Sequence, residues 1–269
     1  AISITQEFPK HQFGWGILGA IYWQSGRHSE AVNANQKAVI LSPHDAEAHS
    51  NLGNTLRELG RLDEAETSYR QAIALKPDFI EAHSNLGVTL QELGRLNEAE
   101  SSYNQAITLK PDFAEAHNNL GNTLQELGRL DQAEASYRQA IALKPDFIEA
   151  YSNLGVALQE LGRLDEALAS EKQAIALNPD FAESHYNLGN ILKELGRLDK
   201  SEASFRQAIV LKDDYAKAHL ALSSMKKFNA QDAQYFKMLE QYSDKNISDE
   251  HRCQINFGLA KACEDLEDF

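Results

Sequence analysis

The chain has 269 residues, of which 42% are hydrophobic and 25% charged, a composition typical of a protein with a buried core. Its net charge of −14 comes with no basic stripe for a phosphate backbone, no apolar run has the length of a membrane span, and its two cysteines fit neither a disulfide framework nor a zinc site. These features argue against nucleic-acid or membrane partners, and they favour a reducing, cytoplasmic compartment without a metal or cofactor.

A 34-residue repeat organises almost the whole chain. The letters NLG recur every 34 residues, and the letters ELGRL follow them at the same interval. The first motif starts at Asn51, Asn85, Asn119, Asn153 and Asn187, and the second at Glu58, Glu92, Glu126, Glu160 and Glu194. Self-similarity at this period is typical of arrays in which each repeat packs on its neighbours.

The chain is expected to begin inside a repeat. Pro9 stands at the proline position of a repeat, so residues 1–11 are predicted to be the end of a preceding, truncated one. Six full repeats follow, numbered 1 to 6 here: 12–45, 46–79, 80–113, 114–147, 148–181 and 182–215.

Repeat 2 shows the helix boundaries that the other repeats share. Gly60 is placed to end the first helix in a left-handed conformation, and Pro77 blocks continuation of the second helix. Asp63 and Asp78 each precede a glutamate by three residues, which is the spacing of a capping box, so we expect them to begin helices. Each repeat is therefore predicted to be a pair of helices.

Apolar residues recur at intervals of three and four in both helices of a repeat, which gives each helix one apolar stripe. In repeat 2 these residues are Leu52, Leu56 and Leu59 in the first helix and Ala65, Tyr69, Ala72 and Ile73 in the second. Neither helix can bury its stripe alone, so we expect neighbouring pairs to stack into an all-α solenoid.

The pattern resembles the tetratricopeptide repeat (TPR). The residues of repeat 2 that carry the resemblance are His49, Leu52, Gly53, Ala65, Tyr69, Ala72 and Pro77. The resemblance covers repeats 1 to 6 and implies a right-handed superhelix whose concave face is formed by the first helices. It also implies a protein–protein interaction scaffold that holds an extended peptide or partner segment in this groove.

The C-terminal residues depart from the pattern. Residues 216–252 are predicted to be a degenerate repeat without the glycine turn or the proline, and residues 253–269 the first helix of a truncated repeat. We infer a fragment of a longer protein. The ending looks like the junction in bacterial proteins that join TPRs to a sulfotransferase domain, and the array resembles the one that precedes the O-linked N-acetylglucosamine transferase domain.

These likenesses leave two alternatives to a scaffold that binds a peptide. The chain is either the non-catalytic, substrate-presenting region of a larger transferase, or a scaffold that assembles through end-to-end packing of its apolar ends. The chain itself contains no phosphate-binding glycine loop, nucleophile elbow or metal spacing, so we expect no enzymatic activity of its own.

The candidate site is a polar stripe on the first helices, on the face away from the leucines. Asparagine lowers helix stability by roughly 0.6 kcal/mol relative to alanine, so its recurrence needs an explanation. Its amide can pair with the backbone of an extended peptide, or it can bond the neighbouring repeat. The stripe contains Asn51, Asn85, Asn119, Asn153 and Asn187, and a second row contains Asn54, Asn122 and Asn190 in alternation with Val88 and Val156.

Five glutamates flank the asparagines: Glu58, Glu92, Glu126, Glu160 and Glu194. They lie in the last turn of the first helices, where the helix dipole disfavours an anion. Salt bridges to nearby arginines or simple solvation would explain them. An acidic groove wall that selects basic peptides is the other interpretation.

Two aromatic residues and a histidine series complete the candidates. Trp23 and Tyr186 are expected at the groove, where aromatic side chains supply much of the binding energy, although Trp23 also fits a contact with a neighbouring repeat. Histidine recurs at one position per repeat, at a spacing too wide for a shared metal ion, so we expect it to pack between helices. The histidines are His49, His83, His117, His185 and His219.

Overall fold

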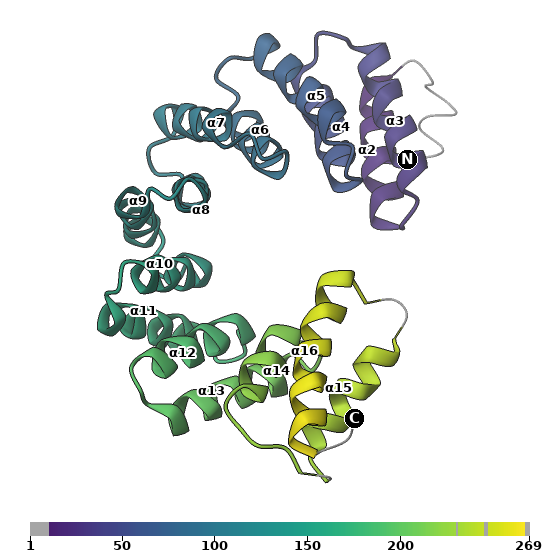
Figure 1. Cartoon of the computed structure of the whole chain (residues 1–269). Helices are drawn as coiled ribbons and strands as arrows, with labels where there is room; N and C mark the ends of the chain where they lie inside the picture. The colour runs from purple at the N-terminus through teal and green to yellow at the C-terminus, as the bar shows by residue number, and fades with distance from the viewer. Residues whose placement is uncertain (1–10, 230, 245–246, 267–269) are drawn as a thin grey trace. The chain divides into compact units, whose positions relative to one another are not determined.

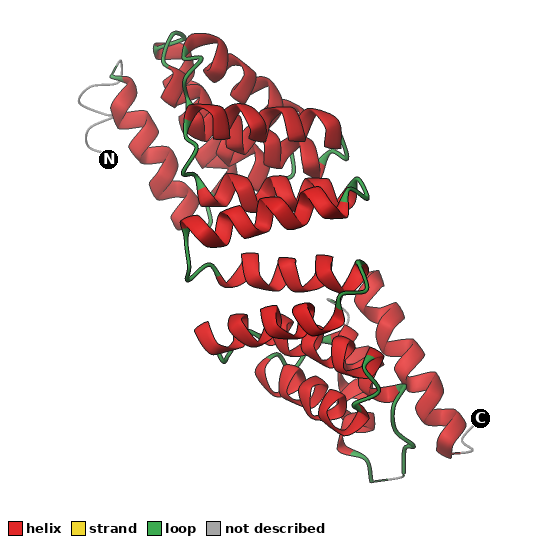
Figure 2. Cartoon of the chain, turned by 90° about the vertical axis from the view of Figure 1, so that its left-hand side faces the viewer, coloured by secondary structure: helices red, strands yellow, loops and turns green. Residues whose placement is uncertain are grey.

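A computed structural model describes residues 11–229, 231–244 and 247–266 of the chain. These residues form fifteen helices and no strand (Figure 2), which confirms the all-α solenoid class. No helix among them is both long enough and apolar enough to span a bilayer. The truncated repeat expected at residues 1–11 lies almost entirely outside the described residues.

The chain divides into two compact parts, which we call the N-terminal block (Ala1–Lys144) and the C-terminal block (Pro145–Phe269). The helices of the N-terminal block are α2 (Gln12–Gln24), α3 (His28–Leu41), α4 (Ala46–Glu58), α5 (Leu62–Leu75), α6 (Ile80–Glu92), α7 (Leu96–Leu109), α8 (Ala114–Glu126) and α9 (Leu130–Leu143). Those of the C-terminal block are α10 (Ile148–Glu160), α11 (Leu164–Leu177), α12 (Ala182–Glu194), α13 (Leu198–Leu211), α14 (Ala216–Ser223), α15 (Ala233–Ser243) and α16 (Asp249–Leu266).

Each repeat of the N-terminal block is an antiparallel helix pair, and the pairs stack in two layers (Figure 1). The first helices α2, α4, α6 and α8 contact one another in sequence, so their layer is the inner side of the curve within this block. We call the surface of this layer that faces away from the second helices the first-helix face.

The close approach of the two helices in a repeat depends on glycine. A Cβ atom at Gly53 would come within 2.7 Å of Cε1 of Tyr69, whose ring is completely buried. Gly87 with Tyr103 and Gly121 with Tyr137 repeat this contact. The recurring Leu-Gly pair therefore supplies one core side chain and one site where the ring of the second helix lies on bare backbone.

The turn between the helices has the predicted geometry. Gly60 has a φ of +72°, its N–H donates to the carbonyl of Arg57 at 2.8 Å, and the N–H of Arg61 donates to Leu56 at 2.9 Å. This pair of bonds is a Schellman motif, which satisfies carbonyls at the helix end. Glycines at the equivalent positions of the other repeats share the positive φ: Gly26, Gly94, Gly128, Gly162 and Gly196.

The predicted capping boxes are wrong. The residue before α6 is Phe79, one position after Asp78, and the residue before α5 is Arg61, two positions before Asp63; neither side chain caps its helix. The Phe79 ring is instead half-buried beneath Nζ of Lys76, which lies 5.0 Å from the ring centroid. Because this ring is buried, phenylalanine occupies the position directly before α6, where a capping residue would have to stand.

Repeat 1 provides the exception that supports this explanation. Asp45 stands where repeats 2 to 5 carry phenylalanine, and its Oδ1 accepts hydrogen bonds from the backbone N–H groups of Glu47 at 2.9 Å and Ala48 at 3.3 Å. An aspartate at this position therefore caps α4 directly.

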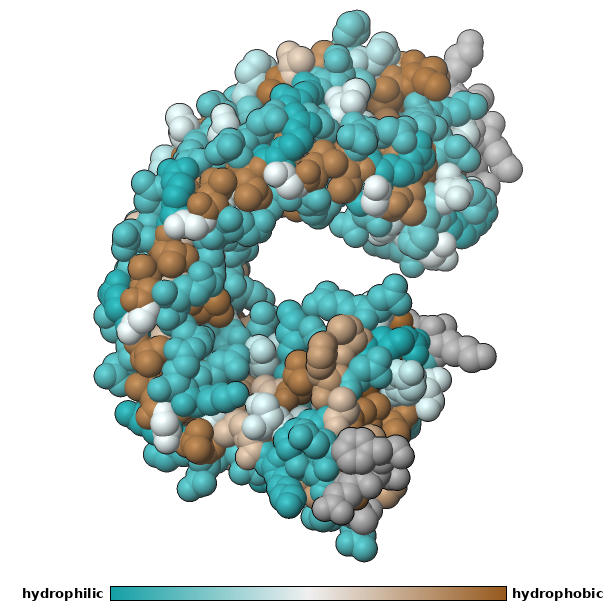
Figure 3. Space-filling model, viewed as in Figure 1, coloured by the Kyte–Doolittle hydropathy of each residue, from teal (hydrophilic) through white to brown (hydrophobic). Residues whose placement is uncertain are grey.

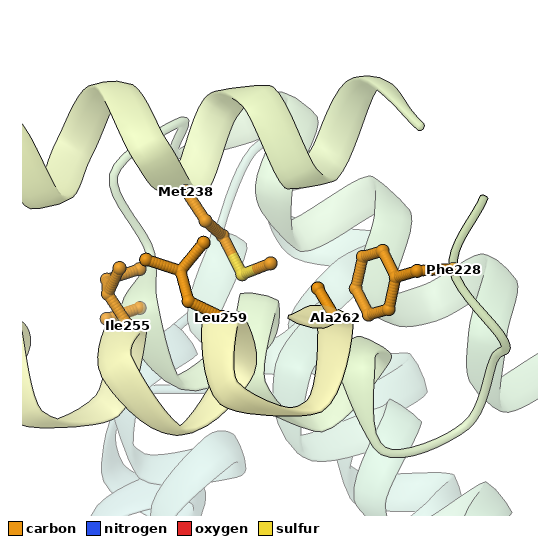
Figure 4. Packing of buried hydrophobic residues seen from close by; sticks show 6 residues of the cluster. Phe228, Met238, Ile255, Leu259 and Ala262 are labelled. Carbon is orange, nitrogen blue, oxygen red and sulfur yellow. The ribbon is translucent and has the colours of Figure 1, made fainter. Parts of the chain in front are cut away.

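In the C-terminal block, α10 to α13 repeat the two-layer arrangement, whereas α14 to α16 form a different cluster. Helix α14 packs mainly against α16, and α15 packs against the same helix. Figure 4 shows the core between them, in which Phe228, Met238, Ile255, Leu259 and Ala262 converge. Helix α16 is continuous across residues 252 and 253, where the sequence analysis placed a boundary.

Candidate functional site

The asparagines of the first helices do not have equivalent environments. Asn51 is exposed, Asn85 and Asn119 are half-buried, and Asn187 is only 8% exposed. Asn153 is also half-buried. The regular spacing in sequence therefore does not give one uniform row of accessible amides.

Asn54 and Asn85 belong to a network that joins repeats 2 and 3. The Tyr69 hydroxyl donates to Oδ1 of Asn54 at 2.7 Å, and Nδ2 of Asn85 donates to the same oxygen at 3.0 Å. Burial raises the pKa of Tyr69, so its hydroxyl remains a donor. At these two residues the amides serve contacts within the chain.

The second row of asparagines has a structural partner in the buried tyrosines. In repeat 4, Oδ1 of Asn122 accepts from the Tyr137 hydroxyl at 2.8 Å. In repeat 3, where Val88 replaces asparagine, the Tyr103 hydroxyl finds only Oε1 of Gln91 at 3.4 Å. In repeat 6 the buried ring is Phe205, which has no hydroxyl, and Asn190 is half-buried. The alternation of asparagine and valine thus changes how well a buried hydroxyl is satisfied.

Trp23 and Asn51 line the same hollow on the first-helix face of repeats 1 and 2. The hollow has a volume of about 260 Å³, and Asn54 and Glu58 also contribute to its wall. Trp23 is half-buried, and its ring centroid lies 4.3 Å from that of His28. Four side chains proposed from the sequence are therefore brought together by α2 and α4.

Tyr186 has a different environment from Trp23. It is half-buried, and its ring lies 5.8 Å from Phe205 and 5.2 Å from Tyr215, measured between centroids. These contacts place much of its surface against neighbouring aromatic residues of the C-terminal block.

All five glutamates of the series are exposed. Glu58 pairs with the adjacent Arg57 at 2.9 Å, whereas Arg61, after the turn, pairs with Glu64 of the second helix. Gln91 donates to Glu126 of the next repeat, and Gln159 donates to Glu194 in the same way. The carboxylates therefore remain on the surface and partly link neighbouring first helices.

Two polar residues at the position of the buried aromatic ring were missed by the sequence reasoning. Asn35 in repeat 1 and Glu171 in repeat 5 stand where the other repeats carry Tyr69, Tyr103, Tyr137 and Phe205. The signal was available, because aligning the six repeats column by column shows these two exceptions directly.

Glu171 is completely buried. The hydroxyl of Ser152 donates to its Oε1 at 3.3 Å, Oε2 has no hydrogen-bond partner, and Nδ2 of Asn187 donates to Ser152 at 3.0 Å. Burial raises the pKa of Glu171 to about 8. The carboxyl group is therefore largely protonated at neutral pH, and Asn187 is part of its surroundings.

The recurring histidines have a structural contact. Nε2 of His49 lies 3.0 Å from the carbonyl of Pro43, and His83, His117 and His185 make the same contact with Pro77, Pro111 and Pro179. The imidazole thus ties its helix to the preceding turn. Within the described ranges, no group of histidine, cysteine and acidic side chains could hold a metal ion.

Family models match the repeats that this geometry defines. A model described as TPR repeat matches residues 19–57, 53–94, 90–128, 122–162 and 158–196, and one described as tetratricopeptide repeat matches residues 182–215. The chain belongs to the tetratricopeptide repeat family. The match spans repeats 1 to 6 almost completely, and the rearranged helices α14 to α16 lie outside it.

Solved TPR structures resemble the chain. MamA is 25% identical over 64% of this chain and 94% of its own, with a TM-score of 0.56. PilW, a type IV pilus biogenesis factor, is 22% identical over 79% of this chain and 97% of its own, with a TM-score of 0.70. YrrB, described as a TPR protein with an unusual peptide-binding site, is 24% identical over 70% and 96%, with a TM-score of 0.55.

PilW and YrrB share the TPR fold with this chain. The comparison with curated proteins found no match. The matched residues are TPR repeats throughout, so this chain is a TPR scaffold.

Proposed function

We propose that this TPR chain holds an extended segment of another protein on its first-helix face. The observation that carries the proposal is the hollow of repeats 1 and 2, where an exposed amide, a carboxylate and an indole ring face the same space. A mostly polar face with a few aromatic anchors is the composition expected of a surface that binds peptides.

The hydrogen bonds divide the asparagines by role. Asn85 and Asn187 donate to side chains of neighbouring repeats, so they stabilise the stack. Asn51, which is exposed, and Asn119, which is half-buried, are the amides that we assign to the ligand backbone within the N-terminal block. The ligand therefore contacts alternate repeats of this block.

Peptides that are selected from a random display library for binding to this chain can test the assignment. We expect the combined change Asn51→Ala and Asn119→Ala to weaken binding at least tenfold, or about 1.4 kcal/mol. The matched control is Gln71→Ala with Gln139→Ala, which removes two exposed amides from the second helices α5 and α9. Equal affinity of both variants and the wild type would contradict the proposal.

The charge of the face favours basic segments. The exposed Glu58, Glu92 and Glu126 on this face and the net charge of −14 would attract a basic ligand and accelerate its association. Because salt screens exposed charges, the association rate of a selected basic peptide should fall between 50 mM and 500 mM salt. A rate that is independent of salt would show that charge does not select the ligand.

Self-association is a second candidate function, and exposed aromatic residues favour it. Phe13 of α2 is 66% exposed and Phe257 of α16 is 64% exposed. Figure 3 shows hydrophobic residues at the surface over the last helices. We expect sedimentation to show concentration-dependent association that Phe257→Ser weakens; a strict monomer at high concentration would contradict this candidate.

The likeness to arrays that precede sulfotransferase or O-linked N-acetylglucosamine transferase domains stays a hypothesis, as does the cytoplasmic location. In that case the first-helix face would present substrates to a catalytic domain encoded beyond Phe269. Sequencing the gene beyond this codon tests it, and a stop codon soon after it would reject the transferase arrangement.

A further inference from the structure

Repeat 1 leaves open a space that the tyrosine ring fills in repeats 2 to 4. Asn35 occupies the tyrosine position and, like Tyr69 above Gly53, lies above a glycine, Gly19. The amide is much shorter than a phenol ring, so the space beyond it stays open. This space is the hollow of about 260 Å³ on the first-helix face.

The floor of the hollow is made of small residues. Gly16, Gly19 and Ala20 of α2 line it, whereas the position of Ala20 is taken by Asn54 in repeat 2. Backbone atoms and one methyl group therefore form the floor. Such a surface accommodates the aliphatic stem of a long side chain, which can be buried while its polar end stays hydrated.

Asn35 lines this space with a short amide whose orientation is fixed. Oγ1 of Thr55 donates to the carbonyl of Asn51 at 2.9 Å, so it accepts the hydrogen bond from Nδ2 of Asn35 at 2.7 Å. This arrangement turns Oδ1 of Asn35 toward Gly19, so close that a Cβ atom on residue 19 would clash with it. The amide is 4% exposed, and its orientation is fixed by a hydrogen bond.

The charge that lines the hollow is negative. Among the described residues that line the hollow, Glu58 is the single charged side chain, and no lysine or arginine takes part. Arg57 pairs with Glu58 from outside the lining, and the carboxylate remains 50% exposed. The indole of Trp23 adds a ring face, which attracts cations.

We propose that this hollow binds one basic side chain, lysine or arginine, of the segment held on the first-helix face. The stem would cross Gly16 and Ala20, and the cation would lie between the Glu58 carboxylate and the Trp23 ring. The inference rests on the proposed function and adds the chemical class of the anchoring side chain.

Asn35→Tyr provides the main test, because it introduces the residue that repeats 2 to 4 carry above the glycine equivalent to Gly19. We expect the ring to fill the hollow without unfolding repeat 1, and circular dichroism with thermal melting verifies this. The probe is the blocked peptide acetyl-Ser-Ala-Arg-Ala-Ser-amide, and the readout is the NMR signal of the Trp23 indole N–H, assigned with Trp23→Phe.

The wild type should bind the arginine peptide at least tenfold more tightly than its citrulline analogue, which has the same shape without the charge. Asn35→Tyr should abolish the shift of the indole signal. Glu58→Gln should weaken binding about fivefold, whereas Glu64→Gln, which removes an arginine-paired carboxylate from the second helix α5, should leave it unchanged.

Equal binding of the arginine and citrulline peptides would overturn the proposal, as would an Asn35→Tyr variant that folds and binds like the wild type. The experiments distinguish a failure of the basic pocket from a failure of the proposed function. If library-selected peptides lose affinity with the Asn51 and Asn119 substitutions but not with Asn35→Tyr, only the basic pocket is rejected. If neither variant changes binding, the first-helix face is rejected as well.

Discussion

Repeats 1 and 5 both lack the buried aromatic ring of their neighbours, and the consequences differ. Asn35 in repeat 1 is neutral, is held by Thr55 and leaves a hollow open to the first-helix face. Glu171 in repeat 5 is ionisable and completely buried, and Oε2 of its carboxyl group has no hydrogen-bond partner. The same position thus tolerates loss of the ring, and the partners of the replacing side chain decide whether a site or a stability cost results.

The largest expected effect concerns the charge of Glu171. Its pKa is raised to about 8 from an ordinary value of 4.5, so folding retains a proton that the unfolded chain releases within this range. The buried, protonated carboxyl group contributes its full stabilisation when the pH is below 4.5, the pKa of the group in the unfolded chain. This stabilisation is lost as the pH rises toward 8. The groups that face it are Ser152 of α10 and Ser184, Asn187 and Glu183 of α12, none of which is a cation.

Over this interval the wild type should lose roughly 4 kcal/mol of stability in repeat 5 relative to Glu171→Gln, at about 1.4 kcal/mol per pH unit. Hydrogen exchange of α10 to α12 at pH 5, 7 and 9 measures the difference. A stability gap between the two proteins that does not grow with pH would contradict the buried, protonated carboxyl.

A methyl group on the glycine beneath the side chain should affect repeats 4 and 5 differently. At Gly121 the new Cβ would lie 2.5 Å from Cε1 of the rigid Tyr137 ring, whereas at Gly155 it would lie 2.7 Å from Oε1 at the flexible end of Glu171. Gly121→Ala should cost roughly 1–3 kcal/mol through overpacking. Gly155→Ala should cost less than 1 kcal/mol, since alanine also favours the helix. Equal losses in urea unfolding would show that the glutamate is packed as rigidly as the ring.

A further comparison concerns two repeats that keep their tyrosine. Asn54→Val removes an acceptor used by both Tyr69 and Asn85, and should cost about 1–2 kcal/mol. Asn122→Val should cost about 0.5–1 kcal/mol, because the Tyr137 hydroxyl keeps Oε1 of Gln125 at 2.9 Å. Thermal melting of both variants gives the ranking, and the reverse order would mean that the asparagines do not serve the tyrosines.

The repeat pattern was sufficient to predict the helix pairs and the left-handed turn at Gly60, because both follow from the local sequence. The helix starts were not predicted, since burial of the Phe79 ring competes with the Asp78 cap. Spacing also placed Asn51 and Asn85 on one face. It could not show that Asn85 reaches Asn54 of the preceding repeat, because that contact depends on how the helix pairs stack.

Photo-cross-linking would show whether ligands bind the first-helix face. A peptide selected from the display library would carry a photoreactive residue, and mass spectrometry would locate the attachment sites on the chain. We expect attachment to α2 and α4, around Trp23 and Asn51, in the wild type. Attachment to the second helices α3, α5, α7 and α9 instead would contradict it.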